Sequence, residues 1–218
     1  MTRELLRVIR LIWGLFLCAL GFVLTINANI GVSPWDVFHQ GLGSQLGITI
    51  GAANIVTAIV IVVFSVLMKE HVGFGTLSNM LLLGMFIDML MRRGMIPEAH
   101  TYTTGVIMMI AGLFILALGT FFYIGAGYGS GPRDSLMVVL TRYLRRPVGF
   151  CRFLTEGTAL VCGWLLGGHA GIGTIIFAFG IGFAVQIVFT LLRFDVKAVS
   201  HETFTETCAR LKVSLRLP

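Results

Sequence analysis

Long apolar stretches alternate along the chain with short breaks rich in glycine, asparagine and charged residues. An apolar helix of about 20 residues spans the hydrocarbon of a bilayer. The pattern predicts six such helices, at 7–26, 50–68, 76–92, 104–123, 148–166 and 174–193. The sequence therefore predicts an all-α polytopic membrane protein.

Two further segments, 34–46 and 132–144, look helical but are short. Each opens with a proline, which suits the first turn of a helix, and Ser33 can cap the first of them. Thirteen residues give a helix of about 20 Å, too short for hydrocarbon about 30 Å thick. Each segment follows a Gly-rich break, and non-helical backbone at membrane depth must be shielded from lipid. We therefore expect both breaks inside the protein.

The second half of the chain repeats the first with an offset of 98 residues. About 23 of the 80 residue pairs between 11–90 and 109–188 are identical. The repeated motif residues are Gly31, Pro34, Asp36, Gly75 and Thr76 in the first half and Gly129, Pro132, Asp134, Gly173 and Thr174 in the second. Duplicated apolar segments are typical of transporters. We expect one membrane domain at 1–194, with repeats at about 7–93 and 104–193.

Two topologies fit this pattern. If the short segments are re-entrant, each repeat has three transmembrane helices and the repeats are inverted. If the short segments cross the membrane, each repeat has four spans and the repeats are parallel. Helix length favours the first. In both, the positive-inside rule places the termini in the cytoplasm, where the tail at 195–218 is expected to form a helix on lipid headgroups.

Composition agrees with a membrane location. The chain is 56% hydrophobic and 12% charged, with a mean hydropathy of +0.92, whereas soluble domains carry about 25% charged residues. The net charge of +6 indicates basic cytoplasmic loops and not a nucleic-acid partner. The four cysteines form no C-x-x-C pair, so neither a zinc site nor a disulfide framework is expected. No nucleophile or Walker A motif is present, and we expect neither an enzyme nor a cofactor.

Ionisable residues within apolar segments are the candidates for function. Asp36 and Asp134 are each the third residue of a short helix. Such a carboxylate can cap its own helix, or it can belong to a site built from inward-pointing half-helices. Arg133 can meet an anionic group or pair with Asp134. Glu156 can line a polar pathway or pair with Arg152, four residues before it.

Other polar residues have simpler explanations. Asp88 stands four residues before Arg92, a favourable helical pair. Asn27 and Asn29 flank the first break, where they are candidates for lining a cavity. The glycines before Thr76 and before Thr174 are expected to supply positive φ in tight turns, with each threonine capping the next helix. No metal site is expected, because His71 and its repeat His169 lack partners at ligand spacing.

The chain also resembles a known family. The residues that carry the likeness are the segment from Gly31 to Leu42 with its Ser-Pro-Trp-Asp motif, Ile50-Gly51, Gly73-Phe-Gly-Thr76 and Asp88. They are similar to the YczE-like membrane proteins of bacteria, which are relatives of the YitT group. The resemblance covers nearly all of residues 5–193 and implies a bacterial inner-membrane protein. It implies no substrate and no active site.

Our first hypothesis is a small-molecule permease whose site lies between the repeats, around Asp36, Asp134 and Glu156. The alternative is a non-transporting membrane partner or regulator of another complex, and a channel is the weaker third option. The expected partners are the lipid bilayer and a small-molecule substrate, and a homodimer stays open.

Overall fold

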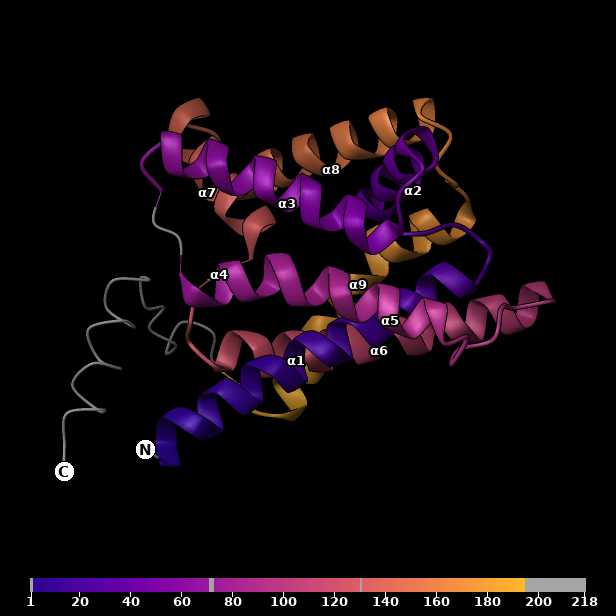
Figure 1. Cartoon of the computed structure of the whole chain (residues 1–218), viewed down its shortest axis with the longest axis horizontal. Coiled ribbons are helices and arrows are strands. Elements are labelled where there is room, and N and C mark those ends of the chain that lie inside the picture. Colours follow the sequence, from indigo (N-terminus) through magenta and orange to yellow (C-terminus); the bar gives the residue numbers. More distant parts are fainter. Residues whose placement is uncertain (1, 71–72, 130, 195–218) are drawn as a thin grey trace.

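The computed structural model describes residues 2–70, 73–129 and 131–194, and the regular structure within them is helical. The helices are α1 (Thr2–Asn27), α2 (Pro34–Leu46), α3 (Ile50–Leu67), α4 (Phe74–Ser78), the π-helical turn η1 (Asn79–Leu83), α5 (Gly84–Arg92), α6 (Tyr102–Gly125), α7 (Pro132–Leu144), α8 (Val148–Leu165) and α9 (Ile172–Leu191). The long helices run roughly along one direction (Figure 1). The predicted tail helix at 195–218 lies outside the described residues.

Most predicted helix boundaries are confirmed within two residues, although α1 and α6 are longer than expected. The two short helices, α2 and α7, begin and end where the sequence places them. Ser33 caps α2 as predicted, since its Oγ accepts a hydrogen bond from the Asp36 backbone N–H at 3.1 Å. The third long segment, 74–92, differs from expectation, because η1 interrupts its α-helical hydrogen bonding.

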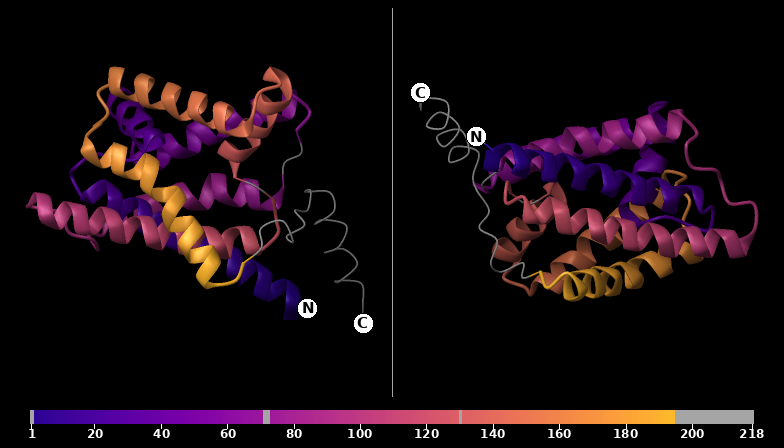
Figure 2. Two further views of the ribbon diagram at one scale, coloured as in Figure 1. Left: turned by 180° about the vertical axis from the view of Figure 1, so that it is seen from behind. Right: turned by 90° about the horizontal axis from the view of Figure 1, so that it is seen from below.

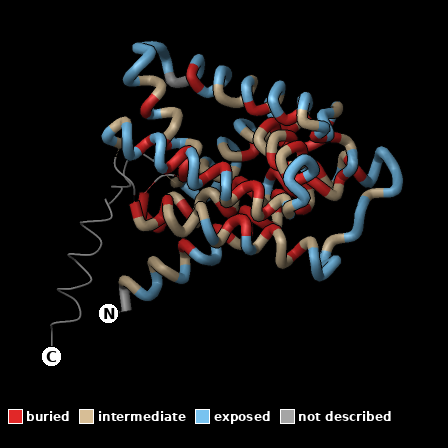
Figure 3. The backbone as a smooth tube through the Cα atoms, turned by 45° about the horizontal axis from the view of Figure 1, so that its top comes forward, coloured by how far each residue is buried: buried red, intermediate tan, exposed pale blue. Residues whose placement is uncertain are grey.

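The protein is a polytopic helical membrane protein. Within the described residues, five segments are long and apolar enough to cross a bilayer: Glu4–Asn27, Ile50–Leu67, Phe74–Arg92, Tyr102–Gly125 and Ile172–Leu191. α8 has 18 residues and is less apolar, since it carries Arg152 and Glu156. Figure 3 shows buried residues concentrated inside the bundle and exposed residues along its outer helices.

The centre of the fold is the antiparallel pair α1 and α6. A Cβ atom on Gly14 would lie 2.9 Å from the carbonyl oxygen of Gly119, and one on Gly21 would lie 2.8 Å from that of Gly112. The offset of 98 residues relates Gly14 to Gly112 and Gly21 to Gly119, so each contact is the counterpart of the other. Small residues at such crossings let helix backbones approach closely.

The Gly-rich breaks are fastened by a second pair of counterpart contacts. Gly75 donates its backbone N–H to the carbonyl of Tyr128, and Gly173 donates to that of Ile30, both at 2.6 Å. A Cβ atom on Gly75 would lie 2.9 Å from the Tyr128 oxygen. Each break is thereby held by the first turn of a helix from the other half. The breaks lie in the interior, as predicted, since Gly31 and Gly129 are both buried.

Our explanation of the glycines in these turns was wrong. Gly73 has φ −91° and Gly171 has φ −155°, so neither supplies a positive φ. The glycines are needed for the close approach of backbone instead. The threonines do cap, from the third helical position: Oγ1 of Thr76 accepts the Gly73 N–H, and Oγ1 of Thr174 accepts the Gly171 N–H.

Candidate functional site

A buried carboxylate and a buried histidine lie one turn apart on α2. The side chains of Asp36 and His39 are each 1% exposed. The Ser33 hydroxyl donates a hydrogen bond to Oδ2 of Asp36. The other oxygen, Oδ1, lies 3.5 Å from Nδ1 of His39, and neither atom has a hydrogen-bond partner within the described residues. Because buried polar groups are normally hydrogen-bonded, this pair is an unusual feature of the interior.

Arg133 brings the second short helix to the same place. Its Cζ atom lies 5.2 Å from the centroid of the Trp35 ring and 5.8 Å from that of Phe22. Trp35 and Arg133 occupy equivalent positions in the two halves, so a side chain from the start of α7 reaches one from the start of α2. Asp36, Asp134 and Glu156 are all close enough to interact with the guanidinium charge. The Nη2 atom of Arg133 is buried without a hydrogen-bond partner among the described residues.

A small polar pocket lies beside these groups. Its volume is about 20 Å³, which is room for about one water molecule. The polar side chains that line it are His39, Asn54, Thr57, Asn79 and Arg133. Asn79 comes from η1, and π-helical turns are frequent at functional sites. Within the described residues no group of three or more histidine, cysteine or carboxylate side chains could hold a metal ion.

A much larger apolar groove is lined in part by Trp35. Its volume is about 580 Å³, and it is partly open. Two helices from each half surround it, α2 and α3 from the first and α7 and α8 from the second. Most of its lining residues are pairs 98 positions apart: Phe38 with Leu136, Leu42 with Leu140, Val56 with Leu154, Thr57 with Thr155, Val60 with Thr158, and Ile61 with Ala159. The groove therefore lies where the two halves face each other, and Thr57 and Ile61 also line the polar pocket.

The two halves differ at one helix crossing. In the first half α3 and α5 touch, and a Cβ atom on Gly84 would lie 2.5 Å from the carbonyl oxygen of Gly51. The equivalent glycines of α8 and α9 are Gly149 and Gly182, and a Cβ atom on either would meet nothing within 4 Å. Within the described residues α8 and α9 have no packing comparable to that of α3 and α5. Figure 2 (left) shows α8 and α9 close at the turn that joins them and diverging towards the end of the bundle that carries the N-terminus.

Asp88 fastens the first of these crossings. It accepts hydrogen bonds from the Thr49 hydroxyl and from the Gly51 backbone N–H, the latter at 2.9 Å. We expected Asp88 to pair with Arg92, but its carboxylate instead reaches the N-terminus of α3, where a negative charge is favoured. Asp88 therefore ties α5 to α3.

Not all predicted site residues join the cluster. Asp36 and Arg133 lie at its centre. Asp134 is exposed, although it interacts with Arg133. Glu156 accepts a hydrogen bond from Nε of Arg152 at 2.9 Å, which is the ion pair that we had considered.

Asn27 and Asn29 are not among the residues that line the polar pocket or the apolar groove. The side chain of Asn27 donates to the carbonyl of Ile96 at 2.7 Å, and its backbone carbonyl accepts the Ala99 N–H. Asn29 has φ +54° and bonds to Glu98. Both fasten the segment that links the halves, because free backbone groups at the end of α1 need partners.

His39 was missed by the sequence analysis. It has no histidine at the equivalent position, which is Met137, so the repeat gave no reason to single it out. The available signal was its spacing, because residues three apart lie on one face of a helix. On a short buried helix that already carries Asp36, this spacing predicts contact.

The comparisons with known proteins identify the family. Residues 5–190 match the model of a family of unknown function, DUF6198. The chain is 38% identical to the uncharacterized membrane protein YczE of Bacillus subtilis over 167 residues, which are 76% of this chain and 77% of that protein. The chain belongs to this YczE-like family. The predicted resemblance is therefore confirmed.

Two other relatives are more distant. An uncharacterized protein of Haemophilus influenzae is 28% identical over 182 residues, 84% of this chain and 83% of that protein. The uncharacterized protein YyaS of Bacillus subtilis is 25% identical over 169 residues, 75% of this chain and 82% of that protein. No solved structure matches the chain.

Proposed function

We propose that this YczE-like protein is a small-molecule permease of the bacterial inner membrane, built from two inverted repeats that share one site. Two contacts between α1 and α6 support the repeats: Gly14 packs against Gly119, and Gly21 packs against Gly112. The offset of 98 residues turns Gly14 into Gly112 and Gly21 into Gly119, so it converts one contact into the other. Such an exchange across an antiparallel helix pair corresponds to a pseudo-twofold axis perpendicular to α1 and α6. An axis of that kind lies in the membrane plane, as in inverted-topology transporters. α2 and α7 are then re-entrant, and the chain has six crossings.

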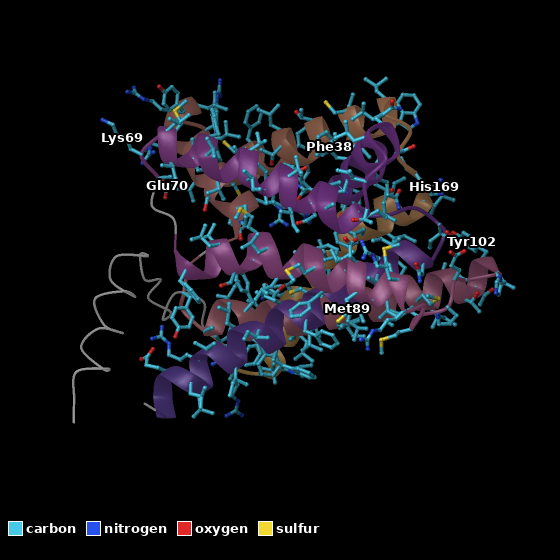
Figure 4. All side chains as sticks on the ribbon, in the orientation of Figure 1. Phe38, Lys69, Glu70, Met89, Tyr102 and His169 are labelled. Carbon is cyan, nitrogen blue, oxygen red and sulfur yellow. The ribbon has the colours of Figure 1, made fainter. Side chains whose placement is uncertain are left out.

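The orientation follows from the basic residues. Lys69 and Glu70 lie at one end of the bundle, and Tyr102 and His169 lie at the other (Figure 4). Arg142 lies at the same end as Lys69, since it forms an ion pair with Glu70. This end also carries the N-terminus (Figure 1), and with it Arg7 near the start of α1. Basic residues favour the cytoplasmic side, so we assign this end to the cytoplasm.

The apolar groove is the observation that carries the proposal. A volume of about 580 Å³ is within the range of small-molecule sites, which are mostly apolar with a few polar groups. The groove lies between the proposed repeats, where alternating-access transporters bind their substrates. Its lining favours a molecule with an apolar body, and Arg133 lies against the lining residue Trp35, where a polar group of the molecule could reach it. The substrate class is therefore an amphipathic small molecule.

The difference between the halves supports movement. Inverted repeats that adopt different conformations open a site to one side, and exchanging the two conformations opens it to the other. The cytoplasmic end is open between α8 and α9, and the opposite end is closed by the Gly51–Gly84 crossing. The conformation described here then faces the cytoplasm.

A groove-filling variant tests the proposal without knowledge of the substrate. Thr155 lines the groove, and Thr155→Trp fills part of it. Phe153 lies on the same helix and is 77% exposed, so Phe153→Trp is the matched control. Cells that produce Thr155→Trp at the wild-type protein level are expected to reproduce the metabolite profile of a deletion strain, and cells with the control are expected to match wild type. If Thr155→Trp restores the wild-type profile, the groove carries no substrate and a non-transporting partner role is favoured.

A further inference from the structure

We propose that Asp36 and His39 form a proton-binding site, and that this proton is the coupling ion of the permease. The coupling rests on the proposed function, whereas the proton binding does not. One proton is taken up between Oδ1 of Asp36 and Nδ1 of His39 and is released to a water molecule in the polar pocket. The exchange moves a proton and no electrons, and it breaks no other bond.

The geometry places two atoms without another hydrogen bond among the described residues, Oδ1 of Asp36 and Nδ1 of His39, where they face each other. Ser33 occupies Oδ2 of Asp36, so Oδ1 is the oxygen that faces His39. Oδ1 and Nδ1 are 3.5 Å apart. This separation is longer than that of a normal hydrogen bond, and a small rotation of either side chain would close it. Both side chains are almost fully buried. A buried polar pair that is not hydrogen-bonded is costly to keep, and an ionisable residue inside a membrane protein is a functional candidate by default.

The path for the proton is the polar pocket. His39 lines it, and its volume of about 20 Å³ holds about one water molecule. Its other polar residues from α3 and η1, Asn54, Thr57 and Asn79, carry no charge. They can therefore hydrogen-bond a water molecule without competing for the proton.

Arg133 makes the proton affinity depend on conformation. It is the charged residue of α7 that acts on both Asp36 and His39. A nearby positive charge favours the ionised carboxylate and opposes a cationic imidazole. Since Asp36 and His39 belong to the first half and Arg133 to the second, rocking of the halves changes their separation. Proton binding must then shift the balance between the two conformations by the same free energy, because such linkage is reciprocal.

The other titratable groups are farther along the same network. Glu156 of α8 and Asp134 of α7 act on Arg133. Tyr123 of α6 is close enough to Asp134 to interact with its charge. These groups influence the Asp36–His39 pair through the charge of Arg133. Replacing Arg133 therefore tests their combined effect on proton binding by the pair.

Trp35 provides a direct reporter, because its ring centroid lies 6.5 Å from that of His39. A protonated imidazole quenches nearby indole fluorescence. The full-length variant Trp13→Phe/Trp164→Phe keeps Trp35 as its single tryptophan. In lipid nanodiscs, its fluorescence is expected to fall in one step as the pH is lowered from about pH 9 to about pH 4, the range that spans carboxylates and histidine. The matched control, Trp35→Phe/Trp164→Phe, leaves Trp13 as the reporter and is expected to show no such step.

Substitutions in the reporter variant assign the step. His39→Gln is expected to abolish it. Asp36→Asn is expected to move the midpoint to lower pH, and Arg133→Gln to higher pH, each by about one unit or more. Constant Trp35 fluorescence across the range, or a step that survives His39→Gln, would overturn the proton site.

Failure of the proton site and failure of the permease can be told apart. If the step is assigned to His39 but Thr155→Trp restores the wild-type metabolite profile, the proton site stands and the permease does not. If the step is absent and Thr155→Trp reproduces the deletion profile, the permease stands and the coupling is wrong. If both hold, His39→Gln should lose the dependence of transport on the pH gradient.

Discussion

Replacing Gly21 by isoleucine is expected to prevent α1 and α6 from packing and to remove most of the folded protein from the membrane. A Cβ atom at this position would lie 2.8 Å from both the Gly112 carbonyl oxygen and the Leu116 backbone nitrogen. Backbone atoms cannot move aside as a flexible side chain can. Overpacking a core costs about 1–3 kcal/mol and sometimes more, and here the whole central crossing must separate, so we expect at least about 3 kcal/mol. The measurements are the yield of monodisperse protein in detergent and its thermal unfolding midpoint.

A matched control exists on α8. Gly157 is also in a helix, and a Cβ atom on it would meet nothing within 4 Å among the described residues. Its equivalent in the first half is Ile59, so Gly157→Ile installs a residue that the other half already carries. This variant is expected to keep the wild-type yield and midpoint. An unchanged midpoint for Gly21→Ile would mean that α1 and α6 do not cross as described.

Local chemistry explains what the sequence predicted well. The bounds of α2 and α7 follow from a proline at the first helical position of each and from the residues that end them, Gly47 and Arg145, which both have positive φ. The glycines of the α1–α6 contact, Gly14, Gly21, Gly112 and Gly119, recur at the repeat offset, but the sequence does not show that they meet. The partner of each glycine required the three-dimensional arrangement, since helical spacing shows which residues share a face and not what that face meets.

Long-range partners explain what the sequence predicted badly. Asn27 looked like a cavity residue, yet it binds the backbone of Ile96 in the linker. Asp88 looked like half of a local pair, yet it binds the start of α3. In both cases the side chain hydrogen-bonds to a backbone group that has no partner within a helix. The spacing of residues along the sequence does not show where such backbone groups lie in the fold.

The repeat predicts two equal halves, and the structure has unequal ones. Much of the difference lies at equivalent positions, 98 residues apart, that carry different residue types. In the first half the Thr49 hydroxyl donates a hydrogen bond to Asp88. The equivalent residues in the second half are Pro147 and Gln186. No side-chain cap is present at the N-terminus of α8, yet a Gln186 carboxamide has an acceptor for the Gly149 N–H. The second half thus has the glycines and an acceptor for such a contact, but α8 and α9 do not make it.

Cysteine pairs at these equivalent positions are expected to form either disulfide, but not both disulfides in the same molecule. We expect Thr49→Cys/Asp88→Cys to form a disulfide in the conformation described here, because the two side chains are in hydrogen-bond contact. Pro147→Cys/Gln186→Cys should cross-link only when α8 closes on α9 and α3 leaves α5. Both pairs are placed in a background with Cys18, Cys151, Cys162 and Cys208 replaced by serine.

The four-cysteine variant gives the decisive measurement, which is the fraction of molecules with each disulfide, determined by mass spectrometry of peptides. The variant is treated with an added thiol oxidant. Under the alternating model one molecule carries one disulfide or the other, and oxidation at lower pH changes the ratio of the two, because protonation of the Asp36–His39 pair biases the conformations before they are trapped. Molecules that carry both disulfides with undisturbed folding would show that the two crossings close independently, and rocking of the halves would then be wrong. Gly149 and Gly182 occupy the same register as Gly51 and Gly84, so under the proposed model both crossings can form, one at a time.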